Sequence, residues 1–230
     1  MKTYRELLKK IYNNVEDREP IEWGNTWIDK PYTNDTKRIL LVGESTSRMV
    51  RSTLARISGY AVDMIGTSSR IDDELFVNQI DSYFNNFLYK YDAIVIQIGH
   101  HGREQRKDNT SIKQDEEQFR EAFDTLLTYL KGISSNITVE TIFDSIIPNK
   151  KWHKFFLHRG WMKEKKDDEI NNITSLRNRI MREVAEKHGV KFLDINPIVD
   201  STRYIHIDHT HFEDSAKPYI AKEMLKIIEQ

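Results

Sequence analysis

The stretch R-I-L-L-V-G-E-S, residues 38–45, decides the fold class of this chain. It begins with a short, largely apolar run, Arg38–Val42, and turns polar after Gly43. A short apolar run that ends at a glycine predicts a buried strand, and we expect a helix to begin near Thr46. A strand, a polar turn and a helix in this order form the repeating unit of parallel α/β sheets.

Four more strand-like runs follow, and amphipathic stretches separate them. The runs are Ala61–Ile65, Ala93–Ile98, Ile137–Phe143 and Val190–Leu193. Helices are expected over Ile71–Leu88, Phe119–Leu130 and Asp168–His188, and from about Asp214 onward. Continuously apolar runs fit central parallel strands that are buried on both faces. The pattern predicts a three-layer α/β/α sandwich with a five-stranded parallel, doubly wound sheet of flavodoxin-like type.

Two segments stand outside this alternation, although we expect residues 1–230 to form a single domain. Residues 1–37 begin with a helical pattern over Tyr4–Val15 and continue as an irregular wrap. That wrap carries too many apolar anchors for a flexible linker. Residues 148–167 form a polar insertion that contains Trp152 and Trp161.

Charge and composition exclude several classes of function. Basic residues number 35 and acidic residues 36, and partners such as duplex DNA or an anionic membrane need a basic face. We therefore expect no nucleic-acid or membrane partner, although a net charge of −1 leaves room for a local basic patch. Cysteine is absent, which excludes disulfides, thiolate metal sites and cysteine nucleophiles. Without a membrane-span or signal-peptide pattern, the expected location is the cytoplasm; the oligomeric state is not indicated.

The ligand site of a doubly wound sheet lies beyond the carboxyl ends of its strands. Ser45, at the first of these ends, can present its hydroxyl beside the N–H groups of a helix N-terminus, which stabilise an oxyanion. The alternative is that Ser45 caps that helix. The turn is not the nucleophile elbow of α/β-hydrolases, because Ser47 stands where that motif requires glycine.

A second group of polar residues, H-I-D-H-T-H at 206–211, precedes the last expected helix. The spacing of Asp208 and His211 lets the carboxylate hold one ring N–H and leaves the other nitrogen free as a general base. Alternatively, these histidines cap the helix or lie in solvent. A third group, G-H-H-G at 99–102, follows the third expected strand. Paired histidines there are unusual as packing residues, the alternative being local bonds to backbone carbonyls.

Taken together, these pieces resemble the SGNH hydrolase family, also called the GDSL-like esterase and acylhydrolase family. That family has a three-layer α/β/α fold with a five-stranded parallel sheet. Its motifs are a G-D-S-like turn after the first strand, a glycine after the second, a G-x-N-D-like turn after the third, and D-x-x-H before the last helix. This chain has, in the same order, G-E-S at 43–45, Gly66, G-H-H-G at 99–102 and D-H-T-H at 208–211.

The resemblance implies a hydrolase of ester bonds with a Ser-His-Asp triad. Ser45 would be the nucleophile, His211 the general base and acid, and Asp208 the residue that orients His211. The backbone N–H groups of Ser45 and Gly66 would form the oxyanion hole. The third donor would be His101, at the position where the family usually has asparagine.

Three positions depart from the family pattern. Glu44 replaces the usual aspartate beside the serine, and this acidic residue is not a triad member. His101 replaces the asparagine, and an imidazole N–H also donates to an oxyanion when its tautomer is right. Gly102 replaces the aspartate of G-x-N-D.

A small acyl ester, in particular an O-acetyl group on a carbohydrate, is the substrate that the resemblance suggests. Glu44, His100, Trp152 and His153 are the predicted substrate contacts, because aromatic and polar side chains together suit sugars or anionic ligands. The alternative is that the tryptophans pack the insertion onto the domain. No cofactor and no metal is expected.

Three other functions remain open at this stage. The same triad can transfer the acyl group to a sugar instead of to water. A metal-dependent hydrolase would use the imidazole and carboxylate donors His206, Asp208, His209 and His211, with His100 and His101. A binding module without catalysis is the non-enzymatic alternative, because a fold does not guarantee an activity.

Overall fold

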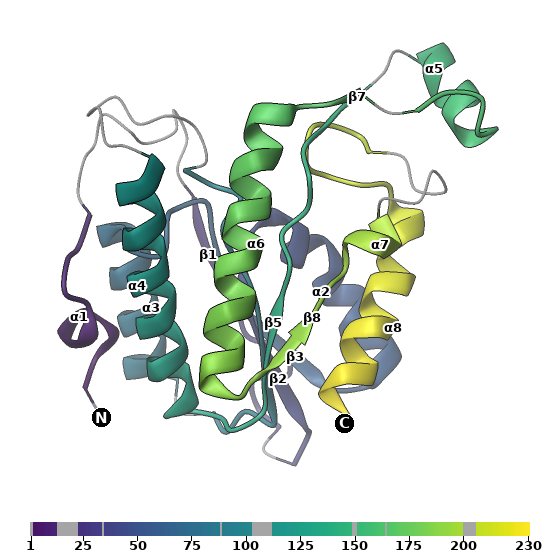
Figure 1. Ribbon diagram of the computed structural model, residues 1–230. Helices are drawn as coiled ribbons and strands as arrows, with labels where there is room; N and C mark the ends of the chain where they lie inside the picture. The colour runs from purple at the N-terminus through teal and green to yellow at the C-terminus, as the bar shows by residue number, and fades with distance from the viewer. Residues whose placement is uncertain are drawn as a thin grey trace.

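The computed structural model (Figure 1) describes residues 2–12, 23–33, 35–87, 89–102, 112–148, 151–163, 165–199 and 206–230. Its main body has three layers, with a six-stranded sheet between two sets of helices. The strand order is β1-β3-β2-β4-β5-β8. The predicted α/β sandwich with a mostly parallel central sheet is confirmed.

The five predicted strands form the parallel part of this sheet. They are β2 (Arg38–Gly43), β3 (Ala61–Thr67), β4 (Ala93–Gln97), β5 (Ile137–Glu140) and β8 (Lys191–Leu193). Every residue of β2, β3, β4 and β5 is buried, as expected for strands covered on both faces. Their carboxyl ends meet at one edge of the sheet.

The sixth strand, β1 (Gly24–Trp27), was not predicted as a strand. It pairs antiparallel with the edge of β3, within the segment that the sequence suggested to be an irregular wrap. Its alternating burial matches a strand with one covered face, but four residues are too few to give a periodic signal. An edge strand needs a partner or a cover for its free N–H and C=O groups, and β1 supplies this for β3.

The N-terminal helix is shorter than the sequence predicts. Helix α1 spans Tyr4–Leu7, begins in a capping box of Thr3 and Glu6, and ends because Leu8 is extended. The chain then pairs with a distant segment: the N–H of Tyr12 donates to the Asp72 carbonyl at 2.7 Å. This tertiary pairing overrides the helical periodicity. Residues 13–22, which include the end of the predicted helix and the start of the predicted wrap, lie outside the described residues.

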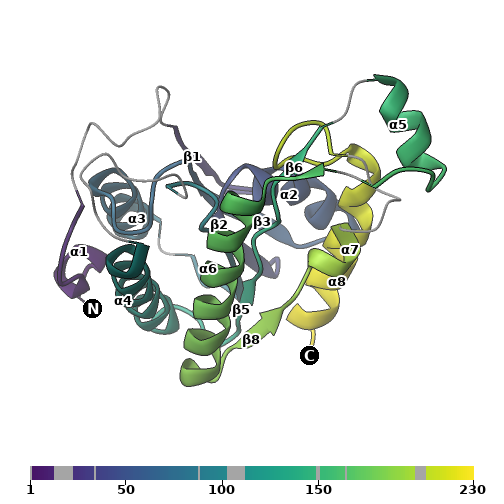
Figure 2. The same ribbon diagram turned by 45° about the horizontal axis from the view of Figure 1, so that its top comes forward.

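Helices cover both faces of the sheet (Figures 1 and 2). On one face, α2 (Ser45–Ser58) and α8 (Lys217–Ile228) pack over a core that includes Leu41, Leu54 and Met224. The other face carries α3 (Glu74–Asn86), α4 (Ile112–Lys131) and α6 (Asp168–His188), with α1 beside them. None of the helices described is both long and apolar enough to cross a membrane.

The predicted insertion forms a small projection from the sandwich. A two-stranded antiparallel ribbon of β6 (Ile146–Ile147) and β7 (Lys165–Lys166) carries helix α5 (Lys151–His158). Both views show α5 standing outside the main body (Figures 1 and 2). The last helix begins where predicted, with a 3₁₀ turn at Asp214–Ala216 that leads into α8, whereas the short helix α7 (Asn196–Val199) was not predicted.

A buried carboxyl group ends β5. Glu140 is 1% exposed, its Oε1 has no hydrogen-bond partner, and burial raises its pKa to about 8. A carboxyl group without a partner is more stable in its neutral form in such surroundings. The folded protein therefore keeps the Glu140 proton at pH values where the unfolded chain has released it.

This difference predicts a pH-dependent stability. Between pH 5 and 8 the unfolded state binds fewer protons at Glu140 than the folded state, so the free energy of unfolding falls as pH rises. Glu140→Met keeps a side chain of similar volume and has no group that titrates. The free energy of unfolding of this variant minus that of the wild type should rise by about 1 kcal/mol per pH unit in this range. Urea denaturation at pH 5, 6, 7 and 8 measures it. Parallel pH curves for the two proteins would contradict the assignment.

Candidate active site

A continuous chain of hydrogen bonds joins Ser45, His211 and Asp208 at the carboxyl edge of the sheet. The Ser45 Oγ lies 2.6 Å from His211 Nε2, and His211 Nδ1 lies 2.6 Å from Asp208 Oδ2. Ser45 opens α2 directly after β2, while the other two residues come from the loop before α8. A proton on Nδ1, donated to the carboxylate, leaves Nε2 to accept the serine hydroxyl.

Asp208 is held in place by its own loop. Its Oδ1 accepts the backbone N–H groups of His211 and Thr210, at 2.7 and 2.9 Å. Burial alone would raise the pKa of Asp208, but these two N–H groups and the His211 ring outweigh it and lower that pKa. The carboxylate is therefore charged at neutral pH, as required to orient an imidazole and to stabilise its protonated form.

Ser45 does not have the capping role that was its structural alternative. The N-cap of α2 is Glu44, whose side chain makes no capping bond, and Ser45 is the first helical residue. Its hydroxyl bonds instead to His211. The N-terminus of α2 also brings unpaired backbone N–H groups and the positive end of the helix dipole to the serine.

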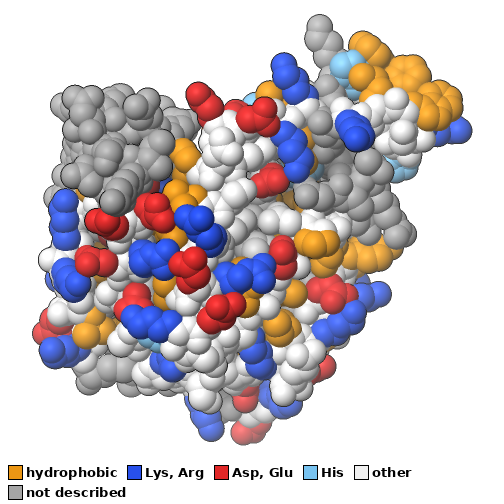
Figure 3. All heavy atoms as spheres, in the orientation of Figure 1, with side chains coloured by type: hydrophobic (Ala, Val, Ile, Leu, Met, Phe, Trp, Pro, Cys, Tyr) orange, Lys and Arg blue, Asp and Glu red, His pale blue; other side chains and the backbone are white. Residues whose placement is uncertain are grey.

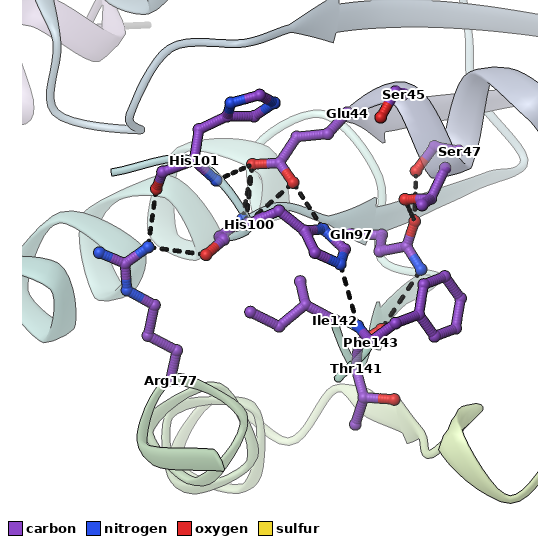
Figure 4. A network of polar contacts seen from close by, with 12 residues as sticks. Glu44, Ser45, Ser47, Gln97, His100, His101, Thr141, Ile142, Phe143 and Arg177 are labelled. Atoms are coloured by element: carbon purple, nitrogen blue, oxygen red, sulfur yellow. Dashed lines mark hydrogen bonds and ion pairs between the residues drawn. The ribbon is translucent and has the colours of Figure 1, made fainter. Parts of the chain in front are cut away.

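Gln97 fixes the first turn of α2 to the sheet (Figure 4). Its side-chain oxygen accepts the hydroxyls of Thr46 (2.6 Å) and Ser47 (3.0 Å), and its amide nitrogen donates to the Thr141 carbonyl. The first turn of α2 lies so close to the end of β2 that a Cβ on Gly43 would be 2.2 Å from Ser47 Oγ. The sequence carried a signal for this role, since Gln97 is the one polar residue in the run Ala93–Ile98.

The carboxylate of Glu44 holds the loop after β4 (Figure 4). Its two oxygens accept the backbone N–H groups of Gly99 (2.9 Å), His100 (2.9 Å) and His101 (3.3 Å), and Oε2 also meets His100 Nδ1 at 2.7 Å. Burial would raise the pKa of Glu44, but the His100 hydrogen bond, the two histidine rings and the Gly99 N–H together lower it to about 2. Glu44 is therefore a buried, fully paired anion.

The His100 ring is hydrogen-bonded on both sides, to Glu44 and to the segment that follows β5. Its Nε2 accepts the backbone N–H of Phe143 at 3.0 Å, so the proton sits on Nδ1 and is donated to Glu44. His100 is 7% exposed and Glu44 only 1%. The sequence suggested that both residues contact the substrate, but here both are turned inward and support the loop.

The backbone of His101 is fixed from two sides. Its N–H donates to Glu44, and its carbonyl accepts Arg177 Nη1 at 2.7 Å. Arg177 also donates to the carbonyls of Gly99 and Gly102, so one buried guanidinium from α6 gathers the whole loop. The His101 ring points away from this network (Figure 4). Sequence reasoning missed Arg177, which has no signal among the many charged residues of its helix.

Gly66 lies within β3, directly beside Gly43 on β2. It is also paired with β1, and a Cβ there would meet Trp27 and Trp23 at 3.1 and 3.3 Å. A larger residue at this position would press on these rings, so they would have to shift by a few tenths of an ångström. A role of its N–H in an oxyanion hole stays a prediction.

The predicted contacts Trp152 and His153 lie on α5, which projects from the body (Figure 1). Trp152 is 57% exposed and its ring packs against that of His153. One charged contact ties α5 to the region after the triad loop: Lys154 Nζ lies 3.6 Å from Glu213 Oε1. The structure therefore places Trp152 and His153 on the projection, apart from the hydrogen-bonded chain of Ser45, His211 and Asp208.

The histidines of the last loop do not form a metal cluster. Within the described ranges, no group of three or more imidazole or carboxylate side chains is arranged to hold a metal ion. His206 is buried with neither ring nitrogen hydrogen-bonded, and burial lowers its pKa to about 4. His209 is exposed. The ligand set of the alternative metal-dependent hydrolase therefore does not come together in this part of the chain.

Similarity to known proteins lies in the fold and not in the sequence. No protein-family model and no curated protein matches the chain. An acetylxylan esterase from Geobacillus stearothermophilus superposes with a TM-score of 0.56 at 12% identity, over 85% of this chain and 96% of that one. An alpha/beta hydrolase enzyme from the metagenome of Lake Arreo superposes with a TM-score of 0.58 at 14% identity, over 86% and 97% of the two chains. The chain thus shares its fold with these two proteins.

Proposed function

We propose that the protein is a serine-dependent esterase that removes a small O-acyl group, in particular O-acetyl, from a carbohydrate. The observation that carries the proposal is the hydrogen-bonded chain from Ser45 through His211 to Asp208 at the ligand edge of the sheet. A related fold in an acetylxylan esterase supports the choice of an acetylated sugar. The reaction proceeds by two-step acyl transfer.

In the first step, Ser45 Oγ attacks the ester carbonyl and forms the new C–O bond. His211 Nε2 receives the hydroxyl proton, and Asp208 stabilises the imidazolium that results. The carbonyl oxygen becomes an oxyanion. His211 then returns the proton to the departing sugar oxygen as the C–O bond breaks, which leaves an acyl group on Ser45.

Three groups are the proposed donors for the oxyanion. They are the Ser45 N–H at the N-terminus of α2, the Gly66 N–H in β3, and the side chain of His101, whose backbone Glu44 and Arg177 hold in place. Donors fixed before the reaction stabilise the developing charge without reorganising. In the second step, water attacks the acyl carbon and gives a proton to His211. The bond between Ser45 Oγ and the acyl carbon then breaks, His211 returns the proton to Oγ, and the acid is released.

Ser45→Ala tests the nucleophile. We expect hydrolysis of p-nitrophenyl acetate to fall by roughly 10⁴-fold or more, because the acyl-enzyme cannot form. Ser52→Ala, at an exposed position on the same helix, serves as the matched control and should keep wild-type activity. Labelling by a fluorophosphonate should disappear in the first variant only. Equal rates in the wild type and Ser45→Ala would refute the proposal.

His101→Ala tests the oxyanion donor. We expect kcat to fall by about 10²–10³-fold with little change in KM, because the lost donor acts in the transition state. His101→Asn, which restores an N–H donor, should recover part of the loss. His209→Ala is the matched control, since this exposed histidine belongs to the loop of His211. A loss in His101→Ala that appears in KM alone would assign the ring to substrate binding.

Glu44→Gln tests the support of the loop. Whichever way the amide is turned, its NH₂ group faces N–H donors, those of His100 at the Oε2 position or those of Gly99 and His101 at Oε1, so the loop should shift and kcat should fall by roughly 10²-fold. Glu44→Asp, which keeps the charge, should retain more activity. Glu169→Gln, an exposed position on α6, is the control. An unchanged kcat in Glu44→Gln, with the variant folded, would remove Glu44 from the positioning of the site.

A further inference from the structure

The projection beside the triad loop has a composition unlike the rest of the surface. We call residues 151–163, α5 and the turn after it, the aromatic arm. It stands on the β6–β7 ribbon, and this ribbon touches the triad loop because the N–H of Ile146 donates to the His209 carbonyl at 2.9 Å. Figures 1 and 2 both show α5 projecting from the side of the molecule that carries α8. The ribbon that carries the arm is therefore hydrogen-bonded directly to the loop of Asp208 and His211.

The arm presents an aromatic stripe to solvent. Trp152, Phe155 and Phe156 are three and four residues apart on α5, and so share one face. Trp161 folds back onto Phe155 and Phe156, with ring centroids 6.2 and 5.7 Å apart. Trp152, Phe155 and Trp161 remain 57%, 53% and 65% exposed. The hydrophobic surface is plain at the upper right of Figure 3.

A basic stripe runs beside the aromatic one. Lys151, Lys154 and His158 share the neighbouring face of α5, and Arg159 lies 5.2 Å over the Phe155 ring. The arm contains four Lys and Arg residues and no acidic residue, while the whole chain is nearly neutral. Lys154 Nζ lies 3.6 Å from Glu213 Oε1, just after the triad loop, so this lysine of the stripe is turned toward that loop.

The geometry points to a binding site for an anionic glycan chain on the aromatic arm. The aromatic rings stack on the apolar faces of sugar residues, and the lysines and Arg159 form ion pairs with the carboxylate groups of those sugars. An acylated residue further along the same chain then lies at Ser45. The inference rests on the proposed esterase function and adds to it the class of substrate, a polymer of acidic sugars.

The charge pattern favours this occupant over two others. A two-fold contact between copies of the chain would place the same basic stripe on both sides of the interface, where like charges repel. An interfacial helix presents an apolar face with a charged face opposite to it. Here the cations lie beside the rings, with Arg159 over Phe155 and Lys154 toward Glu213 after the triad loop, which suits an anionic chain that runs from the arm to the serine.

Binding is tested without turnover, by affinity electrophoresis of the Ser45→Ala protein in gels that contain O-acetylated polygalacturonate or neutral O-acetylated xylan. We expect strong retardation by the acidic polymer alone, which weakens with added salt. The variants Trp161→Ala and Lys151→Ala/Lys163→Ala should each raise the dissociation constant by at least about tenfold, or ~1.4 kcal/mol. Lys10→Ala/Lys90→Ala, which removes two exposed charges elsewhere, should not.

Kinetics on the enzyme with Ser45 intact separate the two proposals. The arm variants should raise KM for the acidic polymer and leave p-nitrophenyl acetate hydrolysis within twofold of the wild type. Equal retardation by both polymers, or unchanged retardation of the arm variants, would overturn the binding site while the esterase stands. If the arm variants lose binding to anionic phospholipid vesicles but bind the acidic polymer as tightly as the protein with an intact arm, the arm is a membrane contact and the glycan site is overturned. Failure of the esterase itself would show as no Ser45-dependent hydrolysis of the small ester.

Discussion

The arrangement of the loops at the candidate active site depends on one buried anion. The carboxylate of Glu44 follows β2 and accepts three successive backbone N–H groups from the loop after β4. It also fixes the tautomer of His100, whose other nitrogen accepts from Phe143 beyond β5. Three strand ends are thus joined through one side chain. Ser45 is the next residue, so the proposed nucleophile and the proposed oxyanion donor share one rigid support.

Much of the sheet was predictable because its signals are local. Each parallel strand is a short apolar run that ends at a polar residue or glycine, and such runs survive in a single sequence without any knowledge of their partners. The meeting of Ser45, Asp208 and His211 also follows from topology, since parallel strands present their carboxyl ends together. Their roles in catalysis remain a proposal, because a hydrogen bond fixes geometry and not turnover.

The remaining features depend on contacts that no local pattern encodes. Strand β1 exists because β3 has a free edge, and α1 stops early because Tyr12 pairs with residues near Asp72. Glu44 and His100 looked like substrate contacts because polar residues at a strand end usually are. Only the fold shows that each is the other's partner, and that Arg177 arrives from α6 to close the loop.

The distribution of tryptophans gives the protein two separate optical reporters. All four tryptophans fall into two pairs, Trp23 and Trp27 at the sheet edge and Trp152 and Trp161 on the aromatic arm. The edge pair is partly buried, against Arg48 and Arg51 of α2, and the arm pair is mostly in water. Emission that a soluble quencher reaches thus reports on the arm, and the protected emission reports on the helix that begins with the serine. Replacing either pair by phenylalanine would let each region be followed alone.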